Sequence, residues 1–270
     1  MKLAVNYSSE AYHLVNEGKI DVDVFKCPDL NDKLIETAQS FRPAYVHFNL
    51  DAGTGNMDKV DWIKIENFLW ETETPYINLH LTALSKDYPA FDINTNDPKE
   101  IEFIIKNVTD DINIVSERFG ADRVIVENVI YRSYEGNMLK PIIDPNIITQ
   151  IIEETKCGLL LDTAHAQMTC RYLNKDVFDY VSQLPLQNLK ELHITGIQHD
   201  GNRYRDSMPM TRADWELAEW ALENIHNGIW SAPWAVSFEY GGVGPAFEWR
   251  TESHVLAEQV PRLHRLVNRK

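Results

Sequence analysis

Short apolar segments alternate with longer amphipathic segments along the whole chain, and this order constrains the fold more than any other feature. Eight short segments, each five to seven residues long, are rich in Val, Ile, Leu, Phe and Tyr. This length and composition are typical of strands that are covered on both faces. We predict strands at residues 2–7, 21–27, 44–50, 76–82, 123–128, 158–162, 189–195 and 234–239.

The longer segments carry the signals that begin and end helices. Asp97 and Pro98 supply a cap and a first helical residue, and Gly120 follows the end of the same segment. Asp144 and Pro145 open another segment in the same way. We predict helices at residues 9–17, 31–40, 58–71, 97–119, 144–156, 174–183, 211–226 and 252–267.

Strict alternation of strands and helices predicts a parallel sheet whose strands are joined by helical crossovers. Eight such units of about 34 residues are the usual content of a (β/α)8 barrel. We therefore predict an α/β fold in which residues 1–270 form a single TIM-barrel domain. A doubly wound open sheet is the weaker alternative, because no Gly-x-Gly-x-x-Gly follows the first strand.

Charge and cysteine content exclude several classes of protein. The chain has 26 basic and 41 acidic residues, a net charge of −15. Nucleic acids and anionic membranes attract basic surfaces, so we expect neither as a partner.

Cys27, Cys157 and Cys170 form no Cys-x-x-Cys pair, and we expect reduced thiols. The chain shows no apolar segment of membrane-spanning length and no signal-peptide core, so we expect a cytoplasmic protein.

Histidine and carboxylate residues stand at the ends of six successive predicted strands. The active site of a (β/α)8 barrel lies at the C-terminal ends of its strands. Imidazole and carboxylate groups bind zinc, iron, manganese and nickel, and burying a carboxylate is costly unless it is paired or bound to metal. We predict two or three metal ions at the barrel mouth, with the ligands His47, His80, Glu127, Asp162, His165, His193 and Glu239.

Each of these histidines alone is also consistent with a hydrogen-bonded core residue, so the prediction rests on the set. We expect the carboxylates of Glu127, Asp162 and Glu239 to take part in catalysis as well as in metal binding. Asp206 is a weaker candidate ligand in the segment that follows the seventh strand.

The segment 196–211 is long, polar and partly basic. Arg203 and Arg205 lie in it, and arginine side chains bind anionic groups through paired hydrogen bonds. We expect these two residues to contact an anionic part of the substrate. A solvated loop with no role in binding is the alternative.

The strand-end residues resemble those of the xylose-isomerase-like barrels, whose metal ligands follow the order His, His, Glu, Asp-x-x-His, His, Glu. Residues 162–165, Asp-Thr-Ala-His, also resemble the corresponding stretch of endonuclease IV. Within this superfamily, the chain is similar to the multinuclear non-heme iron oxidative enzymes, the methanobactin-oxidase-like family. The matching segments are residues 78–82, 126–129, 158–162, 191–196 and 238–239.

This resemblance implies iron ions that activate dioxygen, a peptide substrate and, in many cases, a partner protein that presents the peptide. The chain also departs from the family pattern. Residues 27–29, Cys-Pro-Asp, replace a Glu-Asn-Tyr-like element, Thr163 stands where an Asn is common, and Met208 replaces the His of an Asp-x-His element. A zinc-, manganese- or magnesium-dependent hydrolase or sugar isomerase or epimerase, acting on a small molecule, is the alternative function. A non-catalytic barrel that binds metal or a partner is the third interpretation.

Overall fold

The computed structural model describes residues 1–30, 32–132, 136–199 and 201–269. The chain divides into two compact units, and each takes several separate stretches of sequence. Unit 1 comprises Met1–His47, Lys64–Pro75 and Lys190–Lys270, and unit 2 comprises Phe48–Ile63 and Tyr76–Leu189. The single domain over residues 1–270 stays a prediction.

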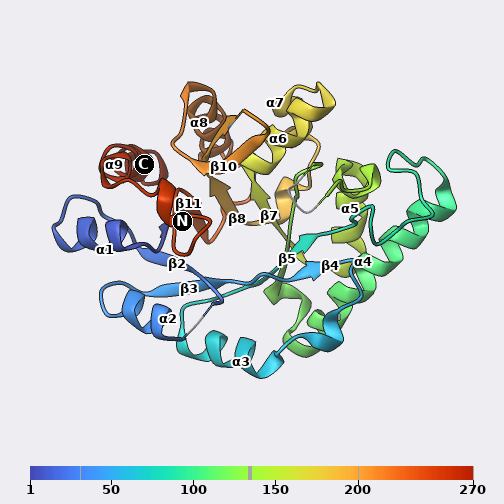
Figure 1. Ribbon diagram of the computed structural model, residues 1–270, viewed down its shortest axis with the longest axis horizontal. Helices are drawn as coiled ribbons and strands as arrows, with labels where there is room; N and C mark the ends of the chain where they lie inside the picture. Colours follow the sequence, from blue (N-terminus) through green and yellow to red (C-terminus); the bar gives the residue numbers. More distant parts are fainter. Residues whose placement is uncertain (31, 133–135, 200, 270) are drawn as a thin grey trace. The chain divides into compact units, whose positions relative to one another are not determined.

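Unit 1 contains a parallel sheet built from the predicted strands, each of them shorter than predicted. The strands lie in the order β3 (Ala44–His47), β2 (Val24–Pro28), β1 (Lys2–Asn6), β11 (Ala235–Phe238) and β8 (Leu189–Ile194) (Figure 1). Ala4, Val24 and Tyr45 from three adjacent strands form a buried apolar cluster, and the ring of Trp234 packs against it. The pairing is parallel throughout, as strand–helix alternation predicts.

The helices of unit 1 begin close to the predicted residues. They are α1 (Ser9–Asn16), α2 (Asp32–Gln39), the part of α3 (Trp62–Glu71) from residue 64 onward, α8 (Arg212–His226) and α9 (Ser253–Val267). A capping box of Thr211 and Asp214 opens α8, as the sequence indicates. α1 lies beside α9, near both chain termini (Figure 1). Asn31, the first residue of the helix predicted at 31–40, lies outside the described residues.

The segment 196–211 contains two short paired strands, so it is not an irregular loop throughout; Asp200 lies outside the described residues. β9 (Gly196–His199) pairs antiparallel with β10 (Tyr204–Met208). Gly196 permits a close backbone approach, because a Cβ atom at this position would lie 2.1 Å from the carbonyl oxygen of Pro209. The polar composition of the segment hides this pairing, since it is the backbone that carries the hydrogen bonds of a hairpin.

Unit 2 contains a second parallel arrangement, in the order β7 (Gly158–Asp162), β6 (Val124–Glu127), β5 (Ile77–Leu81) and β4 (Asp51–Ala52). The strand predicted at 44–50 ends early, at His47, and the chain resumes sheet pairing at Asp51. The register places His80 opposite Glu127 and also opposite Asp51. Polar side chains at the ends of these strands are therefore neighbours.

The helices of unit 2 include α4 (Pro98–Phe119) and α5 (Pro145–Thr155), which pack against each other and agree with the predicted helices. α7 (Val177–Ser182) is shorter than predicted, and α6 (Thr163–Leu173) was not predicted. The side chain of Asp162, the last residue of β7, caps α6 directly, so no loop separates strand from helix. Short 3-10 turns lie at Met57–Lys59, Ala121–Arg123, Lys140–Ile143 and Leu186–Asn188 in unit 2, and at Glu248–Arg250 in unit 1. Among the described residues, no helix has the length and apolar character that membrane crossing requires.

Asp111 on α4 holds the turn that follows β4. Its side chain is buried, and Oδ2 accepts hydrogen bonds from the backbone nitrogens of Gly53, at 2.8 Å, and Gly55, at 2.9 Å. Hydrogen bonds to a charged group contribute about 1.5–3 kcal/mol each.

We expect Asp111→Ala to lower the free energy of unfolding by about 3 kcal/mol, measured by urea denaturation. Asp110→Ala is the matched control, because Asp110 forms an exposed ion pair with Lys106. Equal losses in the two variants would contradict this account.

The three cysteines are buried and free. Burial raises the pKa of the thiols of Cys27 and Cys170 to about 12 and that of Cys157 to about 11. We expect the native protein at pH 8 to resist a thiol-reactive aromatic disulfide that labels all three cysteines in denaturant. The raised pKa values also make the free energy of unfolding depend on pH. Below about pH 9 the thiols are protonated in both the folded and the unfolded chain, and the folded state keeps its full advantage. As the pH rises toward 12, the unfolded chain releases these protons first, and the free energy of unfolding decreases. If the reagent labels the native protein as fast as it labels the denatured protein, the expected resistance of the three thiols is contradicted.

Candidate metal centre

In unit 2, the ends of β5 and β6 bring His80 and Glu127 together. Nε2 of His80 lies 3.4 Å from Oε2 of Glu127. Nδ1 of His80 lies 3.1 Å from the carbonyl oxygen of Leu50. A carbonyl oxygen only accepts hydrogen bonds, so Nδ1 of the neutral ring carries the hydrogen. Nε2 then directs its lone pair toward Glu127.

The end of β7 and the first turn of α6 place Asp162 beside His165. Oδ1 of Asp162 accepts a hydrogen bond from the backbone nitrogen of His165 at 2.7 Å, and Oδ2 lies 3.9 Å from Nε2 of the same histidine. Nδ1 of His165 lies 2.9 Å from the carbonyl oxygen of Asn128 and 3.2 Å from Oε1 of Glu127. The contact with the carbonyl again leaves the Nε2 lone pair directed toward a carboxylate.

Asn128 ties the ends of β6 and β7 together. Its amide nitrogen donates to the carbonyl oxygen of Asp162 at 2.9 Å, and its amide oxygen accepts from the backbone nitrogen of Asp162 at 2.8 Å. These two bonds continue the sheet pairing through a side chain. They fix the backbone from which Glu127, Asp162 and His165 extend.

The donor atoms of this cluster fit a metal ion. Glu127 and Asp162 are each 1% exposed, and an oxygen of one lies within 4.8 Å of an oxygen of the other. Two buried carboxylates at this separation repel each other, and a shared cation removes that cost. Ligands about 2.1 Å from one ion, at ordinary coordination angles, lie roughly 3.0–3.4 Å apart. The separation of His80 and Glu127 agrees with this range.

In unit 1, the ends of β8 and β11 place His193 beside Glu239. Nε2 of His193 donates to Oε1 of Glu191 at 2.7 Å, and Nδ1 lies 3.2 Å from Oε1 of Glu239. The hydroxyl of Tyr45 donates to the same Glu191 oxygen at 2.8 Å. Burial, and then the charge of Glu191, raise the pKa of Tyr45 well above its ordinary value, so this hydroxyl remains a donor. Glu191 therefore orients the imidazole ring of His193.

Lys26 and His47 complete this cluster of unit 1. Lys26 is a buried residue of β2, and its Nζ forms an ion pair with Oε1 of Glu239. The ring of His47 at the end of β3 is centred 5.3 Å from the ring of His193. His47, His193 and Glu239 are predicted from the sequence, whereas Lys26 is not. A signal was available, because a lysine inside the apolar strand sequence VFKCP requires a buried partner.

Glu191, Tyr45 and Asn128 were missed as well. Glu191 precedes His193 by two residues, and Tyr45 precedes His47 by two, so each pair lies on one face of its strand. Applying this period of two along each strand would have identified both residues.

Three histidines thus share one arrangement. One ring nitrogen of each is held by an acceptor: the carbonyl of Leu50 for His80, the carbonyl of Asn128 for His165, and Glu191 for His193. The other ring nitrogen is directed toward a carboxylate oxygen. Metal-binding histidines are held in this way, since the outer hydrogen bond fixes the tautomer and the ring orientation.

The remaining predicted residues lie on or beside β10 of unit 1. The carbonyl oxygen of Asp206 accepts from Nη1 of Arg250 at 2.7 Å. Arg203 and Arg205 are half-buried. Their roles, in metal binding for Asp206 and in substrate binding for the two arginines, stay predictions.

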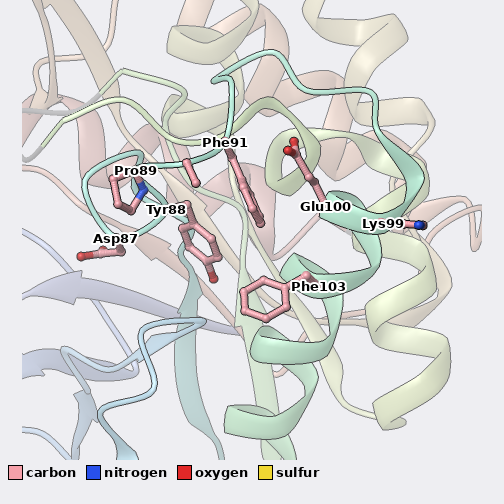
Figure 2. A pocket seen from close by; sticks show the side chains of 8 residues that line it. Asp87, Tyr88, Pro89, Phe91, Lys99, Glu100 and Phe103 are labelled. Atoms are coloured by element: carbon pink, nitrogen blue, oxygen red, sulfur yellow. The ribbon is translucent and has the colours of Figure 1, made fainter.

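A cavity of about 460 Å³ in unit 2 is lined by residues 87–91, in the segment that precedes α4, and by the first two turns of α4. Figure 2 shows the rings of Tyr88, Phe91 and Phe103 gathered around it, with the side chains of Lys99 and Glu100 at its edge. None of its lining residues is a predicted metal ligand. The histidine and carboxylate chemistry of unit 2 therefore lies at the strand ends and not in this cavity.

Comparisons with known proteins bear on both the fold and the family. The model of a family described as RiPP precursor modification enzyme MbnB/TglH/ChrH matches residues 46–230. This range includes all the predicted strand-end ligands except Glu239. A UPF0276 protein from Acaryochloris marina is 23% identical over 223 residues, which are 81% of this chain and 74% of that protein.

Solved structures confirm the fold class. D-psicose 3-epimerase from Clostridium cellulolyticum has a TM-score of 0.53 and 14% identity, with 99% of this chain and 98% of that chain covered. A xylose isomerase-like TIM barrel/4-hydroxyphenylpyruvate dioxygenase fusion protein has a TM-score of 0.60 and 10% identity, with 99% of this chain and 43% of that chain covered. The chain has the predicted α/β fold of the xylose-isomerase-like TIM-barrel class.

Proposed function

Because the chain belongs to the MbnB/TglH/ChrH family of RiPP precursor modification enzymes, we propose that it is an iron-dependent enzyme that oxidatively modifies a precursor peptide. Membership in this family supports the coarser statement, a metal-dependent enzyme acting on peptides. The iron, the oxidative reaction and a partner protein that presents the peptide belong to our proposal.

The observation that carries the metal-dependent part is the arrangement shared by His80, His165 and His193. A histidine that merely stabilises a core has no need of a fixed outer hydrogen bond and an inner nitrogen directed toward a carboxylate. We propose the metal ligands His80, Glu127, Asp162 and His165 in unit 2 and, for an ion that binds more weakly, His47, His193, Glu239 and Asp206 in unit 1.

Bound iron would supply the activation of dioxygen, and the chain supplies the surroundings of the metal. The carbonyl groups of Leu50 and Asn128 hold two imidazole rings in one tautomer, so little reorganisation is needed when metal binds. Buried carboxylates balance the charge of the cation. We propose that Arg203 and Arg205 bind acidic groups of the peptide, since they carry positive charge on a chain of net charge −15.

A zinc- or manganese-dependent hydrolase, isomerase or epimerase is the second candidate. Imidazole and carboxylate ligands suit these metals equally well, so the donor set alone does not separate the two functions. They differ in their response to dioxygen, since only the oxidative reaction consumes it.

The proposal is tested by purifying the full chain without oxygen and measuring its metal content and absorption spectrum. We expect two or three iron ions per chain, and a change of the spectrum when oxygen is admitted. Zinc as the sole bound metal, with no response to oxygen, would overturn the oxidative proposal and favour the second candidate.

A further inference from the structure

We propose that the ammonium group of Lys26 occupies the position of a metal ion beside Glu239 and His193, and that it competes with metal for the Glu239 carboxylate. The inference rests on the proposed metal-dependent function and deepens it. It concerns which of the predicted ligands are available to metal in the folded chain.

The contacts of Glu239 carry this inference. Nζ of Lys26 pairs with Oε1 of Glu239, and the same oxygen lies 3.2 Å from Nδ1 of His193. Nε2 of His193 donates to Glu191, so Nδ1 of the neutral ring presents a lone pair to Glu239. A lone pair and a carboxylate oxygen at this separation are two ligands that share a cation. The structure places the Lys26 ammonium on that carboxylate oxygen.

Burial strengthens the argument. Lys26 is 5% exposed and His193 is fully buried. Lysine is almost never buried unless it is paired, so the Lys26 ammonium depends on Glu239 for its stability. In unit 2, by comparison, both oxygens of Glu127 contact imidazole rings, those of His80 and His165. The two clusters therefore differ: an ammonium group pairs with the carboxylate of Glu239, whereas imidazole rings contact the carboxylate of Glu127.

Competition follows from charge. A carboxylate oxygen paired with a buried ammonium binds a metal ion only if the ammonium leaves, and the departing lysine then loses its partner. This requirement weakens metal binding at Glu239. Lysine suits such a role because its charge is a compact group on a flexible four-carbon stem.

The test compares iron binding by the unmodified full chain with iron binding by its Lys26→Met variant. Each protein is freed of metal with a chelator, equilibrated with Fe²⁺ without oxygen at one free concentration, and analysed for iron. We expect Lys26→Met to hold one more iron per chain than the unmodified protein, and Lys26→Arg to hold no more than it. Lys190→Met is the matched control, because it removes an exposed lysine from β8 of the same unit.

Two further variants assign the effect to Glu239. The double variant Lys26→Met/Glu239→Gln is expected to lose the additional iron. For Glu239→Gln alone, the free Fe²⁺ concentration is set to the lowest value that saturates the unmodified chain. At this concentration we expect the variant to bind as many iron ions per chain as the unmodified protein. This variant keeps the proposal testable if Lys26→Met does not fold.

The outcomes separate this inference from the proposed function. Equal iron in Lys26→Met and the unmodified chain, or loss of an iron in Glu239→Gln alone, would overturn the role of Lys26 while the metal-dependent function stands. Iron bound by Lys26→Met but not by the unmodified chain would support the role of Lys26 and overturn the metal centre of unit 2. Absence of iron from both would overturn both proposals.

Discussion

Replacing Glu127 with glutamine is expected to reduce turnover by about 100-fold or more and to remove bound metal. Glu127 contacts His80 through one oxygen and His165 through the other, so it lies at the centre of the cluster in unit 2. Loss of an outer partner of a metal ligand already costs 10–100-fold, and we expect loss of the ligand itself to cost more. Iron content and turnover of the purified variant measure this directly.

The sign of the stability change separates a lost ligand from a damaged fold. Without metal, Glu127→Gln removes a buried charge, so we expect the metal-free variant to be at least as stable as the metal-free unmodified chain. Metal at 100 times its Kd adds about 2.7 kcal/mol to the unmodified chain. For a chain of this size that is a rise in Tm of roughly 5–10 °C, and we expect the variant to lose most of it.

Glu117→Gln is the control for this experiment, since Glu117 is an exposed carboxylate on α4 of the same unit. It should keep both the metal and the metal-dependent rise in Tm. A Glu127→Gln protein that retains its metal would show that this carboxylate is not a ligand.

Replacing Asp162 is expected to separate two functions of one side chain. Oδ1 caps α6 by accepting from the backbone nitrogen of His165, and Oδ2 is directed toward Nε2 of the same residue. Asp162→Asn keeps an acceptor for the cap but loses the charge, so we expect loss of metal, a decrease in turnover of about 100-fold and an intact α6. Asp162→Ala also loses the cap and should lower the free energy of unfolding by about 1 kcal/mol more.

Asp176 provides the matched control for these variants. It caps α7 of the same unit by accepting from the backbone nitrogen of Asp179 at 3.0 Å. Asp176→Ala should cost about 1 kcal/mol of stability without loss of metal. Thermal unfolding and metal analysis of the four proteins complete the comparison. Metal retained in Asp162→Asn would contradict the role of this carboxylate.

Much of the fold could be predicted because local signals coincide with the structure. Asp97, Pro98 and Gly120 mark α4 at both ends, and the apolar run 158–162 is β7. α6 was missed because Asp162 is both the last strand residue and the helix cap, so no loop residues separate the two elements. The antiparallel pairing of β9 and β10 was missed because backbone pairing leaves little trace in a polar sequence.

The candidate site shows the same limit. His80, Glu127 and Asp162 could be predicted because each ends a recognisable strand. The ion pair of Lys26 and Glu239 could not, because Lys26 on β2 and Glu239 at the end of β11 come from opposite ends of the chain and from strands on either side of β1 in the sheet. Sequence patterns indicate where a strand ends, whereas the partners of its side chains depend on tertiary contacts.

Anomalous X-ray diffraction at the iron edge, from crystals of the full chain grown without oxygen, tests the central claim most directly. We predict strong anomalous peaks within metal–ligand distance, about 2.0–2.2 Å, of Nε2 of His80 and of carboxylate oxygens of Glu127 and Asp162. Iron-saturated crystals with no anomalous peak at these three residues would contradict the account.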